Sequence, residues 1–175
     1  MRLRDENKQQ HEAAVADDLL KHLKIAPKLA RPGNPTKNEP DRMYRIDEKI
    51  IGVEVVTAYY SNDEAQATAE AAAEKPIAED EIRVGGVIGS PDDSICESIQ
   101  ENLSTKCAKK YSGADETWLC INVDAALTEL ECIKECVEAL HVPANPFARI
   151  YVTVNNAEGG VVEVFEVPSG NNPSK

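Results

Sequence analysis

Residues 49–60 have the sequence KIIGVEVVTAYY, and this run decides the fold class. Ile, Val, Thr and Tyr are the residues that pleated strands favour. The apolar side chains fall on both faces of the segment, which is typical of a strand covered by other elements on both sides. We therefore predict a central strand, in which Glu54 is a carboxylate set among aliphatic neighbours.

The residues before this strand predict a hairpin and a helix. Residues 41–46 form the first strand of the hairpin, with a turn at residues 47–49. Further upstream, residues 5–24 carry apolar side chains at spacings of three and four, which predicts an amphipathic helix. Four prolines between residues 27 and 40 predict an irregular connection from this helix to the hairpin.

The remaining chain alternates helical and strand patterns. An exposed Ala- and Glu-rich helix or partly ordered insertion is predicted at residues 62–75, and an extended piece with a flexible turn at residues 83–91. The later elements are a helix at 93–111, a strand at 118–124, a helix at 127–140 and strands at 149–155 and 160–167. The predicted fold class is α/β, a mixed central sheet flanked by helices, in one domain spanning residues 1–168. Residues 62–90 would be an insertion, and residues 169–175 a polar tail.

Composition limits the classes of function. The chain has 175 residues, 42% of them hydrophobic, which is enough for one core. Its net charge of -12 argues against a protein that coats nucleic acid without specificity, because such binding relies on Lys and Arg. No stretch approaches the roughly 20 apolar residues of a membrane span, and no signal-peptide core opens the chain. We expect a cytoplasmic protein that does not bind membranes.

The five cysteines form an odd set without a CxxC motif. They fall inside apolar periodic segments, so we interpret them as small buried hydrophobes. Zinc is the alternative, because Cys132 and Cys136 share a helix face, although no further His or Cys pair stands at metal-ligand spacing.

Acidic side chains on neighbouring strands indicate a metal site. Asp41, in the sequence Glu39-Pro40-Asp41, opens one strand of the hairpin, and Glu54 lies on the next. Mg²⁺ binds through one or two carboxylates, keeps several waters and completes its shell with phosphate oxygens. Glu12 lies on the apolar face of the first helix, where a carboxylate requires a partner. Solvation of Glu12 near a helix start and turn formation by Asp41 are the structural alternatives.

In element order and in the placement of these acids, residues 8–155 resemble the PD-(D/E)xK nuclease superfamily, which has the restriction-endonuclease-like fold. The resemblance implies that Glu12, Asp41 and Glu54 are catalytic, with Asp41 and Glu54 as ligands of Mg²⁺, for which Mn²⁺ can substitute. It also implies a nucleic-acid substrate, DNA rather than RNA, and a homodimer.

The chain departs from the family pattern at Val56, which occupies the position of the family lysine. In some members of the superfamily this lysine migrates to another element, and Lys106 is the candidate here, because it lies on the apolar face of the helix at 93–111. Lys110, one turn further on, is the second choice, and Gln100 is a candidate for orienting a water. A structural alternative is that Lys106 extends from the edge of a core helix into solvent.

Three functions remain open at this point. The first is a divalent-metal-dependent nuclease built on the three carboxylates. The second is a degenerate nuclease fold retained as a binding or regulatory module, which Val56 and the acidic charge favour. The third is an acidic partner protein, such as an immunity protein, that presents residues 62–101 to a basic surface.

Overall fold

The computed structural model describes residues 3–59, 91–124, 129–156 and 160–168. The elements follow the order α1 (Leu3–His22), β1 (Leu29–Pro32), η1 (Pro35–Lys37), β2 (Arg42–Ile46), β3 (Lys49–Ala58), α3 (Pro91–Cys107), β4 (Glu116–Asp124), α4 (Leu130–Ala139), β5 (Arg149–Asn155) and β6 (Val161–Glu166). The insertion predicted at residues 62–90 lies entirely outside the described residues, so its predicted helix and flexible turn are not tested.

In the described part of the chain, six strands form one sheet in the order β1-β2-β3-β4-β5-β6. The β3–β4 and β4–β5 pairs are parallel, and the other three pairs are antiparallel. The sheet is therefore mixed, as predicted, and β3 has a partner on each side. β6 lies at one edge of the sheet and β1 at the other.

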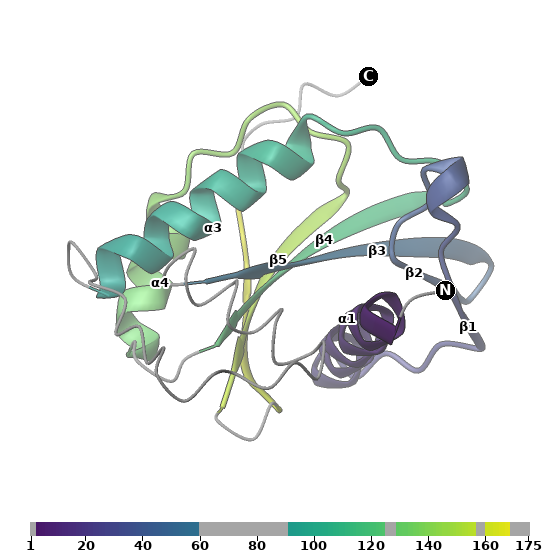
Figure 1. The fold of residues 1–175 in the computed structure, drawn as a ribbon, viewed down its shortest axis with the longest axis horizontal. Helices are drawn as coiled ribbons and strands as arrows, with labels where there is room; N and C mark the ends of the chain where they lie inside the picture. Colours follow the sequence, from purple (N-terminus) through teal and green to yellow (C-terminus); the bar gives the residue numbers. More distant parts are fainter. Residues whose placement is uncertain (1–2, 60–90, 125–128, 157–159, 169–175) are drawn as a thin grey trace.

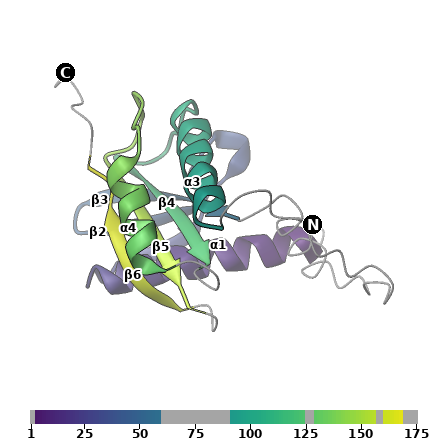
Figure 2. The same cartoon turned by 90° about the vertical axis from the view of Figure 1, so that its left-hand side faces the viewer.

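Helices cover both faces of this sheet (Figures 1 and 2). On one face, α3 and α4 bury Ile99, Leu103 and Ile133 against the alternate residues of β4 and β5. On the other face, α1 buries Leu19 and Leu20 against the remaining alternate residues of the central strands. The alternation of side chains along each strand divides the core into these two layers.

The connection between residues 27 and 40 is more regular than predicted. It contains β1, whose four residues pair with β2, and the short helix η1. β1 is an exposed edge strand that ends in Pro32, so it shows neither the apolar alternation nor the length from which strands are recognised. η1 starts after Asn34, whose side chain accepts a hydrogen bond from the Thr36 N–H.

Helix α3 ends earlier than predicted, at Cys107 instead of residue 111. The Lys109 N–H donates to the Lys106 carbonyl three residues back, which closes the helix with a tighter turn. Gly113 lies further along the following loop, with a φ of 81°. The chain after Cys107 is therefore free to turn back over the sheet.

The prediction for the cysteines is wrong in part. Cys96 of α3 and Cys136 of α4 form a disulfide with a Cα–Cα distance of 5.4 Å. Cys107 and Cys120 are buried as predicted, whereas Cys132 is half-buried. The disulfide removes Cys136 from the alternative zinc set. A pairing across 40 residues leaves no spacing signal in the sequence.

Within the described residues, none of the helices combines the length and the apolar character that crossing a bilayer requires.

Candidate carboxylate and lysine site

The candidate site forms where β3 extends beyond its partner β2. The pairing of the two strands stops at Arg42, opposite Val53. Past this point the Val55 N–H donates to Asp41 Oδ2 over 2.9 Å. The side chain of Asp41 thus satisfies the backbone of β3 where β2 no longer does, and this contact fixes the carboxylate beside the unpaired part of β3.

Glu54 points from β3 toward helix α3, where it meets Lys106. The Lys106 Nζ lies 2.6 Å from Glu54 Oε1. Both side chains are sheltered, with exposed fractions of 15% for Lys106 and 7% for Glu54. Lys106 follows the buried Leu103 by one helical turn, so the periodicity of the helix carries its stem along the core and its ammonium to the strand.

Glu12 approaches the same site from α1, on the opposite face of the sheet. Its carboxylate pairs with Lys8 over 3.4 Å, four residues earlier on the helix. Burial raises the pKa of Glu12, an effect that Lys8 partly offsets and that the charge of Glu54 increases. The three acids therefore lie close enough to influence one another, although each comes from a different element.

The strongest sign of this proximity is the pKa of Asp41. Burial, then the charges of Glu54 and Glu12, raise it to about 7, while the hydrogen bond from Val55 opposes the change. A carboxylate crowded by other carboxylates holds its proton more tightly, and a cation placed among them relieves the repulsion. At Asp41, burial and the charges of the two other acids thus outweigh the opposing effects of the Val55 N–H and Lys106.

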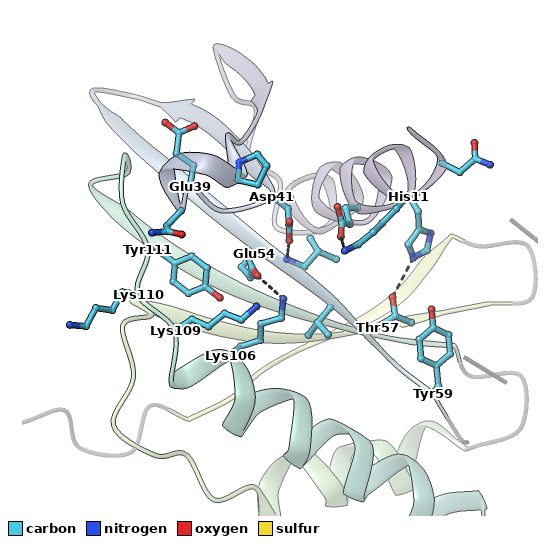
Figure 3. Close-up of a pocket in the computed structure, with 17 residues that line it drawn as sticks. His11, Glu39, Asp41, Glu54, Thr57, Tyr59, Lys106, Lys109, Lys110 and Tyr111 are labelled. Atoms are coloured by element: carbon cyan, nitrogen blue, oxygen red, sulfur yellow. Dashed lines mark hydrogen bonds and ion pairs between the residues drawn. The ribbon is translucent and has the colours of Figure 1, made fainter. Parts of the chain in front are cut away.

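These side chains line a pocket with a volume of about 580 Å³ (Figure 3). Its walls come from the first half of α1, the turn around η1, the end of β3, and α3 with the loop that follows it. The lining residues are Asn7, Lys8, His11, Glu12, Pro35, Asn38, Glu39, Asp41, Glu54, Val55, Val56, Thr57, Tyr59, Lys106, Lys109, Lys110 and Tyr111. A volume of this size is ordinary for a small-molecule or single-nucleotide site.

The sequence did not single out Tyr111 as a site residue. Its hydroxyl is buried and lies near the Glu54 carboxylate, outside ordinary hydrogen-bond geometry with any described residue. Burial, followed by the charge of Glu54, raises the pKa of the phenol, so it stays protonated. Its ring packs against Phe147 with the centroids 5.3 Å apart. The Tyr111 hydroxyl thus lies beside Glu54 and faces the pocket in which the acids gather (Figure 3).

Glu39, the first residue of the Glu-Pro-Asp motif, has a structural role. Its carboxylate accepts two hydrogen bonds from Arg31 and one from the Asn34 N–H. Gly113 packs so closely that a Cβ there would lie 2.9 Å from Glu39 Oε1. This clasp ties the turn before Asp41 to the loop after α3, and the Glu39 carboxylate points away from Asp41 (Figure 3).

Two other residues that the sequence singled out lie apart from the acids. Gln100 does not line the pocket. Its side-chain amide donates to the His141 carbonyl and accepts from the His141 N–H, each with a donor–acceptor distance of 2.9 Å. It therefore fastens α3 to the segment after α4, and it is not placed to orient a water. Lys110 lines the mouth of the pocket, and its ammonium points away from Glu54 (Figure 3).

The donor set can be compared with the needs of a divalent cation. Within the described residues, no group of three or more His, Cys, Asp or Glu side chains stands ready around a common metal position. Mg²⁺ needs only one or two carboxylates, because water and phosphate oxygens complete its shell. Asp41 and Glu54 meet this requirement, although Lys106 occupies one oxygen of Glu54.

The fold and the site define an α/β protein whose mixed sheet carries a carboxylate and lysine pocket at the open edge of a central strand. No family model, curated protein or solved structure matches the chain. The functional argument therefore rests on the geometry of this pocket.

Proposed function

We propose that the protein hydrolyses phosphodiester bonds of nucleic acid with a divalent metal, and that its fold is restriction-endonuclease-like. The observation that carries the proposal is the gathering of Glu12, Asp41 and Glu54, from three separate elements, around one pocket with Lys106. Carboxylates close together in a sheltered site are costly unless a cation or a proton joins them. Titratable groups with shifted pKa values cluster at functional sites, and binding a divalent metal is one use for a group of acids.

The residues have distinct roles in this proposal. Asp41 and Glu54 would hold the metal, and Glu12 would add negative charge from the opposite face of the sheet. A metal bound there lowers the pKa of a bound water and neutralises charge on the phosphate. The Val55 N–H keeps Asp41 in one orientation, so the site needs little reorganisation before it binds.

Lys106 would supply the positive charge of the family lysine, whose position on the strand is occupied by Val56. The Val56 side chain lines the same pocket, and the Lys106 ammonium enters from α3 to reach Glu54. From there it can donate to a phosphate oxygen or hold a water against the phosphorus, the roles that a lysine plays in phosphoryl chemistry. The hydroxyl of Tyr111, buried beside Glu54, is a further donor directed at the same space.

A second function, the binding module without catalysis, is favoured by the ion pair itself. Lys106 already neutralises Glu54 at 2.6 Å, so the pair is satisfied without a metal. The third, an acidic partner protein, depends on residues 62–101, most of which lie outside the described residues. A substrate of DNA rather than RNA, and a homodimer, remain parts of the first proposal.

A cleavage assay tests the proposal. The wild-type protein and the variant Glu54→Gln are each incubated with Mg²⁺ or Mn²⁺ and with labelled single- and double-stranded DNA and RNA. A matched control is Glu97→Gln, an exposed acid of α3 outside the pocket. We expect metal-dependent cleavage that falls at least about a hundredfold in Glu54→Gln and is unchanged in the control. Absence of cleavage with every substrate, or equal rates in all three proteins, would favour the binding module.

A further inference from the structure

The loop that follows α3 presents two lysines at the mouth of the pocket. Lys109 and Lys110 are both exposed, and both line the pocket. Neither forms an ion pair with any described residue. Acidic residues outnumber Lys and Arg by 31 to 19 in this chain, so these two lysines place local positive charge at the pocket of an acidic protein.

The backbone of this loop is held in place directly after the lysines. The Ser112 N–H donates to the Asn38 carbonyl over 3.0 Å, and the Ser112 hydroxyl donates to the Lys37 carbonyl. The ring of Tyr111 packs on Phe147. The lysines therefore project from an anchored loop, which lowers the entropy cost of using them to bind a ligand.

The two ammonium groups point in different directions. Lys109 extends toward Lys106 and Glu54, whereas Lys110 extends outward, away from the carboxylates (Figure 3). A chain of phosphates entering the pocket would thus meet Lys110 first, then Lys109, and then the acids. Across the pocket, Lys8 and His11 of α1 line the opposite wall.

The acids lie at the sheltered floor of this pocket. Glu54 is only 6% exposed, so a phosphate that reaches it has to enter a recess between α1 and the loop after α3. A flexible strand enters such a recess more easily than the backbone of a stiff duplex does. The half-buried Tyr59 lines the same pocket, and a basic groove with an aromatic side chain is the usual pattern for binding single strands.

We propose that Lys109 and Lys110 form the entrance of a track for single-stranded nucleic acid, with Tyr59 as a stacking platform for a base. The inference rests on the proposed function for the identity of the substrate. It adds the substrate class, a single strand, and two phosphate-binding residues outside the carboxylate cluster. Binding, measured apart from cleavage, tests it.

The experiment measures fluorescence anisotropy of a labelled single strand of about 20 nucleotides, and of the same sequence as a duplex. The full chain is used in EDTA and again with Ca²⁺, between about 50 and 200 mM NaCl. The test variant is Lys109→Ala/Lys110→Ala. The matched control is Lys21→Ala/Lys28→Ala, which removes two exposed lysines outside the pocket. Melting temperatures establish that both variants fold.

We expect the wild type to bind the single strand more tightly than the duplex. The test variant should bind the single strand at least about tenfold more weakly than the wild type. The logarithmic dependence of its affinity on salt should be less steep by about 1.4, because each phosphate contact in a single strand contributes about 0.7. The control should bind like the wild type. Tyr59→Ala should bind about fivefold more weakly or worse, as loss of one stacked base predicts.

Three results would overturn the inference: no binding, tighter binding of the duplex, or equal binding by the test variant and the control. The proposed function fails separately. Lysine-dependent binding without cleavage in the presence of Mg²⁺ or Mn²⁺ would refute the nuclease function but support the single-strand track. Cleavage that does not depend on Lys109 and Lys110 would refute the single-strand track but support the nuclease function.

Discussion

Replacing Lys106 with Met tests whether the buried ion pair is as important as its position indicates. Methionine keeps most of the length and apolar stem of the lysine but removes the charge. The change leaves the Glu54 carboxylate, 7% exposed, without the ammonium that lies 2.6 Å away. The same chain offers a comparison, because Lys49 and Glu116 form a pair with nearly the same distance, 2.5 Å, at exposed fractions of 63% and 30%.

The magnitude follows from the burial of the two pairs. At 2.6 Å the attraction between unit charges is about 6 kcal/mol for an effective dielectric constant of about 20. Much of this is offset by the cost of removing both ions from water, and loss of one member of a buried pair typically costs about 3–5 kcal/mol. We therefore expect Lys106→Met to lower the free energy of unfolding by about 3 kcal/mol. Lys49→Met should lower it by less than about 1 kcal/mol.

Urea unfolding measures both variants, together with Glu54→Gln and the double variant Lys106→Met/Glu54→Gln. The double variant should recover at least about 1.5 kcal/mol relative to the sum of the single changes, because it leaves no buried charge unpaired. Saturating Mg²⁺ should stabilise Lys106→Met more than the wild type, since the lysine no longer competes for Glu54. Equal losses for Lys106→Met and Lys49→Met would refute the argument that burial makes this pair strong.

Three further predictions concern the surroundings of the site. Without metal, Asp41 should make the protein less stable as the pH rises from about 4 to about 7, because its pKa is raised to about 7 in the folded state. In urea titrations the wild type should lose up to about 1.4 kcal/mol per pH unit relative to Asp41→Asn. Parallel pH profiles for the two proteins would contradict this prediction. Cys96→Ser/Cys136→Ser should lower the free energy of unfolding by about 2–4 kcal/mol, because the disulfide closes a 40-residue span; a melting curve that reducing agent leaves unchanged in the wild type would contradict it. Gly113→Ala should destabilise by about 1 kcal/mol or more in thermal melts, since its φ of 81° and the nearby Glu39 carboxylate both oppose a Cβ, and a neutral effect would show that the clasp can yield.

The fold was predictable where the sequence pattern reflects burial. β3 is buried along most of its length, and its apolar run therefore predicted its central place. The helical period that buries Ile99 and Leu103 also brings Lys106 to the sheet, as the position of this lysine on the helix indicated. The prediction failed for β1, where all four residues are exposed and hydrophobic alternation gives no signal.

The less predictable parts of the site depend on contacts between distant segments. Tyr111 and Lys109 lie on a loop, which has no periodicity, and Ser112 reaches the carbonyls of the turn around η1. The pairing of Gln100 with His141 likewise joins α3 to a segment about forty residues away. No spacing rule in a single sequence predicts such contacts. A polar residue on a helix can therefore hydrogen-bond a distant loop as readily as it can line a functional site.

The claim that Asp41 and Glu54 hold a divalent cation underlies the account, and a Mn²⁺ titration followed by electron paramagnetic resonance tests it most directly. The signal of free Mn²⁺ gives the number and the affinity of bound ions in the wild type, in Asp41→Asn and in the exposed-acid control Glu97→Gln. The account predicts Mn²⁺ binding in the wild type and in the control, weakened at least about tenfold in Asp41→Asn. Identical binding in all three proteins, or none in the wild type, would contradict it.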